Sequence, residues 1–251
     1  MSSPFRLFAL CASALLLSVP ALAQQPATTN AASATLTAPT DAAQKMINDA
    51  VQKMNANDVA GALTSLNEAL KVNPKSTGAY VLRASIYYQK KQWAQAGSDF
   101  KAASLLAPKN SVLKFNIAEV EFQQKQFDTA RAGFAALQTD PDMGDFASYK
   151  VFLCNLFGGH VDIAKKELDA LTDAMNGPSC EFSNAAWNLF YKKLDGDDGA
   201  RYWLLRASRV YPPQKNNFYA QSLRDLGYLP IPGPDDKVVP PGAGAAAPSQ
   251  L

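Results

Sequence analysis

The sequence is poor in the side chains that perform chemistry. It has one histidine and three cysteines in 251 residues, and it has no Cys-x-x-Cys pair, no glycine-rich phosphate loop and no nucleophile elbow. His160 follows two glycines in a turn, and Cys154 lies six residues earlier, on a different helical face. We therefore predict no catalytic residue, no cofactor and no metal site, and we expect the protein not to be an enzyme.

An excess of charge of one sign is also lacking. The chain has 24 basic and 22 acidic residues, and without Arg6 the balance is 23 to 22, a net charge of +1. Such a balance gives no long-range field that would gather nucleic acid or an anionic membrane, so we expect neither as a partner. The acidic turn at 195–198 lacks the terminal glutamate and the spacing of an EF-hand loop, so it does not predict a calcium site.

Long apolar runs are absent except near the start. Residues 7–19 are almost uninterruptedly apolar after Arg6, and Pro20 precedes Ala21-Leu22-Ala23. The run is shorter than the roughly 20 residues that a membrane-spanning helix needs, and the two alanines fit a signal-peptidase site before Gln24. We expect 1–23 to be a cleaved signal peptide, the alternative being an uncleaved anchor. The mature protein would then be exported, to the periplasm or otherwise secreted, and would meet the membrane only through that signal.

Both ends of the mature chain lack apolar periodicity. Residues 24–40 are mostly alanine, threonine, proline and asparagine without charge, and 230–251 are rich in proline, glycine and alanine. Such segments bury too little apolar surface to offset the entropy of ordering them. We predict a disordered leader at 24–40 and a disordered tail at 230–251, with the first helix starting at Asp41 as its N-cap.

The middle of the chain repeats. A small residue recurs at spacings of 34, 34, 34 and 36, at Ala62, Ala96, Ala130, Ala164 and Ala200. A large residue follows each of them four positions later, namely Leu66, Phe100, Phe134, Leu168 and Leu204. Alanine lets a neighbouring helix backbone approach closely, and phenylalanine or leucine fills the adjoining groove. The pattern predicts amphipathic helices that pack in pairs.

The best-formed unit, at 77–110, resembles a tetratricopeptide repeat. Its first helix carries Tyr80, Ala84 and Tyr87, its second carries the Ala-x3-Phe step, and Pro108 closes it. The resemblance implies an all-α fold, a right-handed superhelical α-solenoid of about five helix pairs with a C-terminal capping helix. The expected pairs are 41–76, 77–110, 111–144, 145–178 and 181–214, with a cap at 215–229 that uses Phe218, Leu223 and Leu226. No repeat can bury its apolar face alone, so we expect 41–229 to be one array.

The same resemblance predicts a binding surface. In tetratricopeptide arrays the leading helices line a concave groove, and here that stripe holds Val81, Ser85, Tyr88, Phe115, Glu119, Phe122, Tyr149, Leu153 and Phe157. Some relatives hold a terminal carboxylate with lysine, asparagine and arginine, which are missing from this stripe apart from nearby Asn116 and Lys150. An aromatic stripe favours an apolar or amphipathic segment instead. The alternative is that part of the stripe packs between neighbouring repeats.

Two functions stay open at this point. The first is an exported scaffold or adaptor that binds a peptide or a partner protein in the groove, with Tyr88, Phe115, Phe122 and Tyr149 as a connected aromatic patch. The second is a structural or self-associating protein of the cell envelope, a homo-oligomer without a peptide ligand.

Cys154 lies within the leading helix of the fourth unit, and Cys180 directly precedes the leading helix of the fifth. An exported protein meets conditions that permit disulfides, and adjacent repeats stack their leading helices side by side. A Cys154–Cys180 bridge and two buried thiols are therefore both compatible with the sequence.

Overall fold

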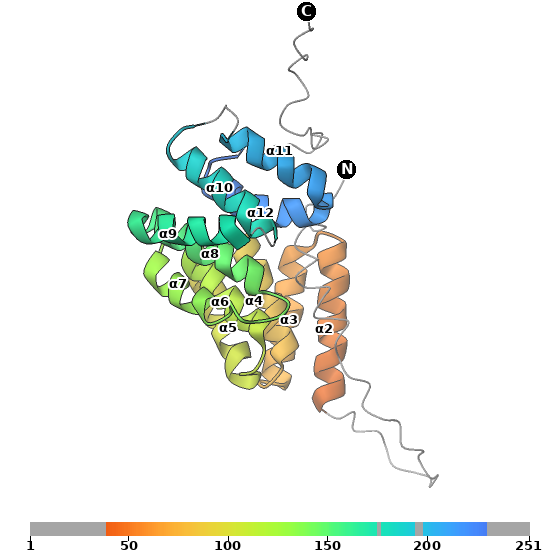
Figure 1. Ribbon diagram of the computed structural model, residues 1–251. Coiled ribbons are helices and arrows are strands. Elements are labelled where there is room, and N and C mark those ends of the chain that lie inside the picture. The colour runs from red at the N-terminus through yellow and green to blue at the C-terminus, as the bar shows by residue number, and fades with distance from the viewer. Residues whose placement is uncertain (1–38, 175–176, 194–197, 230–251) are drawn as a thin grey trace, which may run out of the picture. The chain divides into compact units, whose positions relative to one another are not determined.

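The computed structural model describes residues 39–174, 177–193 and 198–229 (Figure 1). Every regular element in that part of the chain is a helix, which confirms the predicted all-α fold. The helices are α2 (Pro39–Asn55), α3 (Val59–Val72), α4 (Thr77–Gln89), α5 (Trp93–Leu106), α6 (Ser111–Gln123), α7 (Phe127–Ala135), α8 (Gly144–Phe157), α9 (Val161–Ala174), α10 (Pro178–Phe190), α11 (Ala200–Val210) and α12 (Pro213–Asp225). The predicted signal peptide, the leader up to residue 38 and the tail lie outside the described residues.

The first described helix starts earlier than predicted. It begins at Pro39, so Asp41 lies in its first turn and is not its N-cap. Proline suits the first helical turn because the N–H that it lacks would have no intrahelical partner there. The carboxylate of Asp41 in that turn still interacts favourably with the helix dipole.

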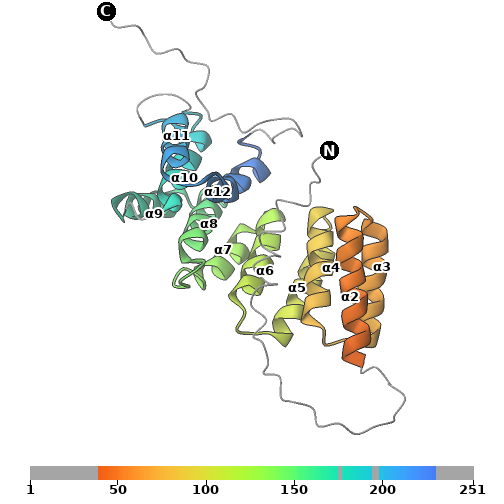
Figure 2. The same ribbon diagram turned by 90° about the vertical axis from the view of Figure 1, so that its right-hand side faces the viewer.

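The described chain divides into two compact units. Unit 1 ends at Lys109 and contains α2 to α5, and unit 2 begins at Asn110 and contains α6 to α12. Within unit 1 the helices lie side by side, with α2 paired to α3 and α4 paired to α5 (Figure 2). Within unit 2 the pairs are α6 with α7, α8 with α9, and α10 with α11. That 41–229 forms one array stays a prediction.

The backbone conformation of the turns within the helix pairs repeats along the described chain, as the sequence pattern does. The turn inside each helix pair contains one residue in the left-handed region: Asn57 (φ 63°), Lys91 (φ 56°), Lys125 (φ 60°), Gly159 (φ 88°) and Lys192 (φ 57°). This conformation is unfavourable for any residue with a Cβ atom. Since four of these five turns use such a residue, the packing of the two helices must impose the turn geometry.

The predicted small and large positions form the contact line of each pair. The five alanines at the small position are each at most 1% exposed. Four of the five large residues that follow them are buried, and Leu204 is half-buried. Close approach at alanine and filling by phenylalanine or leucine are therefore the packing rule in both units.

Arg83 stands where the repeat family has leucine, and an ion pair accounts for it. Its guanidinium donates to both carboxylate oxygens of Asp99 on α5 at 2.7 Å, and to the Asn67 amide oxygen on α3 at 2.6 Å. The hydrogen bonds to Asp99 raise the pKa of Arg83, as expected for a two-pronged charged pair. A polar clamp across α3, α4 and α5 thus replaces the apolar contact.

Truncating Phe100 tests the predicted register. The ring is buried in α5, so Phe100→Ala should lower the free energy of unfolding by about 3–5 kcal/mol, because it opens a cavity. Leu105→Ala on the same helix is the matched control, since Leu105 is 84% exposed and its loss should change stability by less than about 0.5 kcal/mol. Urea denaturation measures both, and equal midpoints for the two variants would contradict the packing described here.

Candidate functional site

The inner face of each unit is the surface made by the first helices of its pairs, which the sequence predicts to line the groove. In unit 1, Val81 on α4 is buried, whereas Ser85 and Tyr88 are half-buried. The Ser85 hydroxyl donates to the Val81 carbonyl oxygen at 2.9 Å, and the Tyr88 ring meets Trp93 edge-on at 5.0 Å. Unit 1 therefore leaves part of its predicted groove stripe accessible.

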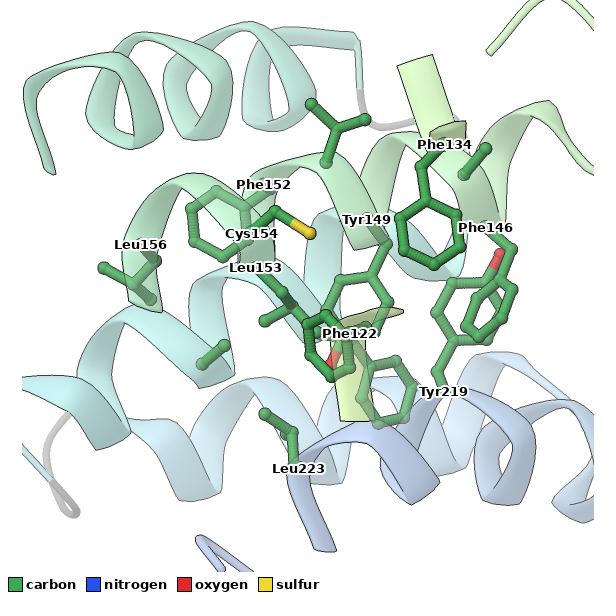
Figure 3. Close-up of a cluster of buried hydrophobic side chains, with 14 of the residues drawn as sticks. Phe122, Phe134, Phe146, Tyr149, Phe152, Leu153, Cys154, Leu156, Tyr219 and Leu223 are labelled. Atoms are coloured by element: carbon green, nitrogen blue, oxygen red, sulfur yellow. The ribbon is translucent and has the colours of Figure 1, made fainter. Parts of the chain in front are cut away.

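In unit 2, the inner face carries a helix of the chain itself. Tyr219 of α12, which is 3% exposed, packs on Phe146 at 4.8 Å, on Tyr149 at 5.4 Å and on Phe182 at 5.5 Å between ring centroids. Figure 3 shows Tyr219 and Leu223 of α12 pointing toward the labelled side chains of α8. These contacts hold α12 against α8 and α10. The rings of Phe146, Tyr149 and Phe182 beneath it are called the aromatic floor below.

Three polar contacts fix α12 in this position. The Tyr219 hydroxyl donates to the Asp145 carboxylate, which also accepts from Ser179 on α10. The Lys150 ammonium donates to the Ser222 hydroxyl at 3.3 Å. At the other end, the Gln123 side-chain amide of α6 donates to Asp225 at 2.8 Å. Because these contacts reach α6, α8 and α10, α12 lies across three helices of the inner face.

The predicted C-terminal helix thus exists and packs on the last pair, α10 and α11, and it also reaches onto the inner face beyond that pair. Of the three apolar contacts that the sequence favoured, Leu223 is buried and Leu226 packs against the core, whereas Phe218 is 39% exposed. The structure buries Tyr219 as well. α12 meets the C-terminal end of α11 through Asn216, whose amide donates to the carbonyl oxygens of Ala207 and Tyr211. The aromatic floor on α8 and α10 offers Tyr219 more partners, which explains why α12 turns onto the inner face.

Two of the predicted groove residues in unit 2 are packing residues between helices. Phe115 on α6 is buried against Phe134 at 5.0 Å and Phe146 at 5.3 Å. Phe122 is buried against Phe127 at 5.5 Å and Phe134 at 6.5 Å. Their rings fill the space between α6 and the following helices, which favours the alternative that this part of the stripe is packing. That they anchor a partner stays a prediction.

Three of the other four predicted residues lie under the C-terminal segment or in the core beside it, and the fourth, Glu119, forms an ion pair with Lys150. Tyr149 and Leu153 on α8 are fully buried in the same apolar cluster as Tyr219 and Leu223 (Figure 3). Phe157 is half-buried and contacts Phe190 on α10 and Tyr228 at 5.7 and 5.3 Å. These side chains are not open to a partner while the C-terminal segment stays in place.

Sequence reasoning missed the role of Lys150. Its side chain is 0% exposed, its ammonium lies 2.8 Å from the Glu119 carboxylate, and it sits 3.4 Å from the centroid of the Phe122 ring. A buried ammonium requires such an ion pair and ring contact. Glu119 and Lys150 are 31 positions apart, so no local pattern in the sequence indicates the pair. Both are engaged, which removes Lys150 as a clamp for a peptide carboxylate.

The Tyr149 hydroxyl on α8 is among the buried polar atoms of unit 2 that lack a hydrogen bond. The Tyr149 hydroxyl is fully enclosed and has no hydrogen-bonding partner. Burial, with the Glu119 carboxylate as a second cause, raises the pKa of Tyr149. Leaving a buried hydroxyl unsatisfied costs about 1–3 kcal/mol, so the fit of α12 to this surface is imperfect.

Both cysteines of unit 2 are free thiols in the structure, so the disulfide that the sequence left open is not formed. Cys154 belongs to the apolar cluster of α8, and burial raises the pKa of its thiol to about 12. Burial also raises the pKa of Cys180, whose sulfur lies 3.9 Å from the Asn184 amide. Both side chains pack as small apolar groups.

His160 has a structural contact. Its Nε2 lies 2.9 Å from the Asp128 carboxylate and links the turn before α9 to the first turn of α7. Among the described residues, no group of three histidine, cysteine, aspartate or glutamate side chains is placed to hold a metal ion.

Comparisons with known proteins bear on the fold. No protein-family model matches the sequence. A solved structure of PilW, described as a widely conserved type IV pilus biogenesis factor, superposes with a TM-score of 0.53 at 22% identity, over 74% of this chain and 86% of that chain. A tetratricopeptide repeat protein from Parabacteroides merdae ATCC 43184 gives 0.55 at 14% identity, over 75% of each chain. A thermophilic tetratricopeptide repeat protein of Thermus thermophilus, TTC0263, gives 0.50 at 18% identity, over 73% of this chain and 100% of that chain. The similarity is one of fold, and it confirms the predicted tetratricopeptide architecture.

Two tyrosine variants test the contacts that hold α12 in place. Tyr219→Phe removes a hydroxyl that donates to a carboxylate and should cost about 1–2 kcal/mol of unfolding free energy. Tyr149→Phe removes a buried hydroxyl without a partner and should leave stability unchanged or raise it by up to about 1 kcal/mol. Urea denaturation of the two variants side by side measures the difference. A loss for Tyr149→Phe equal to that for Tyr219→Phe would contradict the contacts described.

The thiols provide a second test. Because Cys154 and Cys180 are buried thiols with raised pKa values, the native protein should react slowly with a thiol reagent. Unfolding without a reductant should then make both alkylatable, as peptide mass spectrometry would show. A disulfide-linked peptide containing Cys154 and Cys180 would overturn the assignment of free thiols.

Proposed function

We propose that this chain, which has the tetratricopeptide-repeat fold, is a protein-interaction scaffold whose inner face binds an amphipathic segment of a partner protein. One observation carries the proposal: the inner face of unit 2 already holds a helix, α12, through an aromatic floor and polar contacts at its rim. Docking an amphipathic helix into an apolar groove is an established mode of protein recognition.

Unit 1 has an inner face of its own, and part of that face is accessible. Ser85 and Tyr88 of α4 are half-buried, and Trp93 lies against the Tyr88 ring. Half-exposed aromatic rings are frequent anchors of protein partners because they bury much apolar area and lose little conformational entropy. We propose that a partner segment contacts α4 through these residues.

The setting we propose is the cell envelope. The apolar run at 7–19 and the Ala21-Leu22-Ala23 site support export, although they lie outside the described residues. No helix in the described part of the chain is both long and apolar enough to cross a bilayer. PilW, which shares the fold, is described as a type IV pilus biogenesis factor, and an envelope assembly is a comparable setting for this chain.

A second candidate function is self-association through α11. The outer side of this helix exposes Tyr202 and Val210, at 42% and 59%. Together with Leu205, Arg206 and Arg209 they line a shallow pocket on unit 2. Apolar side chains gathered on an exposed helix face favour contact with another chain.

Photo-crosslinking separates the two functions. A benzoylphenylalanine at Tyr88 should crosslink to a specific partner protein in the native host, because the inner face of unit 1 contacts it. Gln95, which is exposed on α5, is the matched control position and should give no product. A third probe at Tyr202 reports on α11. If Gln95 gives the same product as Tyr88, the result counts against the scaffold. A crosslinked homodimer from Tyr202 alone also counts against the scaffold and supports self-association.

A further inference from the structure

The helix α12 is amphipathic and buries one face, as a helical ligand bound in a groove does. Its buried side chains are Tyr219, Ala220, Ser222 and Leu223, whereas Gln214 and Lys215 are exposed. The spacing i, i+1, i+3, i+4 places the buried side chains on one face of the helix. This is the pattern by which an amphipathic helix fills a groove.

The site beneath α12 is built by elements remote in sequence. Its floor and rim come from α6, α8 and α10, between Gln123 and Phe182. Only Tyr211 and Pro212 join α11 to α12. A short tether gives α12 an effective concentration on the order of millimolar at this site, so α12 can close the site without an especially tight fit.

The fit also leaves an unmet hydrogen bond. The Tyr149 hydroxyl is fully buried next to the Tyr219 ring and has no acceptor. Ser222 is the residue of α12 that reaches Lys150 at 3.3 Å, and Lys150 in turn pairs with Glu119. An occupant of this site therefore presents a hydrogen-bond acceptor to the Lys150 ammonium at the position of Ser222.

We propose that the inner face of unit 2 is a helix-binding site that α12 keeps closed. The partner that opens it carries a helix with the Tyr-x-x-polar-Leu spacing of Tyr219, Ser222 and Leu223, in which the polar residue offers a neutral acceptor to the Lys150 ammonium. This inference rests on the proposed scaffold function and specifies both the ligand of unit 2 and its regulation: binding requires that α12 be displaced.

Competition with a synthetic helix tests the proposal in the full-length protein. The probe is a fluorescent peptide of residues 213–229. Wild type should bind it weakly, because the peptide must displace the tethered copy. The Leu223→Ala protein should bind it about tenfold or more tightly, since losing a buried leucine weakens the tethered helix by more than a factor of ten.

Two controls accompany this measurement. Gln214→Ala changes an exposed residue of α12 and should leave the affinity of the protein at the wild-type value. A peptide carrying Leu223→Ala should fail to bind any of the proteins. Equal affinity of the wild-type and Leu223→Ala proteins, with unchanged helical circular dichroism, would overturn the proposal.

A second variant covers the case in which Leu223→Ala does not fold. A protease-cleavable Gly-Ser insertion between Tyr211 and Pro212 leaves every buried contact of α12 intact. After cleavage and dilution, the fragment from Pro212 onward should dissociate and the labelled peptide should take its place. A fragment that stays bound after dilution into excess peptide would show that α12 is a permanent part of the fold.

The acceptor requirement has its own test. A peptide with Ser222→Ala should bind the Leu223→Ala protein about threefold or more weakly than the unaltered peptide, because the Lys150 ammonium loses an acceptor. Equal affinity of the two peptides would overturn the acceptor part of the proposal. A stable dimer of the uncleaved insertion protein in light scattering would identify α12 of a second copy as the occupant and overturn a separate partner.

The outcomes also separate this inference from the proposed function. A specific crosslink at Tyr88 with no peptide binding to unit 2 would support the proposed scaffold function and reject the proposal that α12 closes a helix-binding site. Peptide binding without a crosslink at Tyr88 would keep the helix site and reject the partner surface of unit 1.

Discussion

The whole fold depends on one constraint, the close approach of the two helices in each pair. That approach is possible because a nearly inaccessible alanine stands at the contact, with a leucine or phenylalanine one turn later. It also fixes the turn between the helices, where asparagine or lysine accepts a left-handed conformation that glycine would adopt at lower cost. Each pair then offers its neighbour a first helix with an apolar inner side, and the inner face follows from the repetition.

In unit 2 the apolar inner side would be costly to leave in water. α12 covers it with Tyr219 and Leu223, and the rim contacts at Asp145 and Asp225 set its orientation. The buried pair of Lys150 with Glu119 contributes a different property. Its charges cannot be left unpaired at low dielectric, so it selects for an occupant with a polar atom at one point of an otherwise apolar surface. The same groups that hold α12 therefore define what could replace it.

The repeat could be predicted from the sequence because its signal is local. Ala96 and Phe100 are one helical turn apart, and the spacing of about 34 recurs along the chain. The position of α12 on the inner face could not be predicted, because Tyr219 and Tyr149 are 70 positions apart. The same apolar stripe would also suit a helix that covers the last repeat alone. The surroundings of the groove residues could not be predicted for a related reason: an aromatic side chain on a leading helix, such as Phe122, can point to solvent or to the next repeat. Only the structure shows which neighbour covers it.

Native-state hydrogen exchange in dilute urea tests the central claim most directly, namely that α12 is a separable helix lying in a binding site. If it is, the amides of Tyr219 to Leu223 open with a smaller free energy than those of Tyr149 to Cys154 beneath them, as a local unit that detaches before unit 2 unfolds. The account predicts this order, with α8 still protected when α12 exchanges. Exchange of α12 and α8 at one common free energy, in a single cooperative opening, would contradict it.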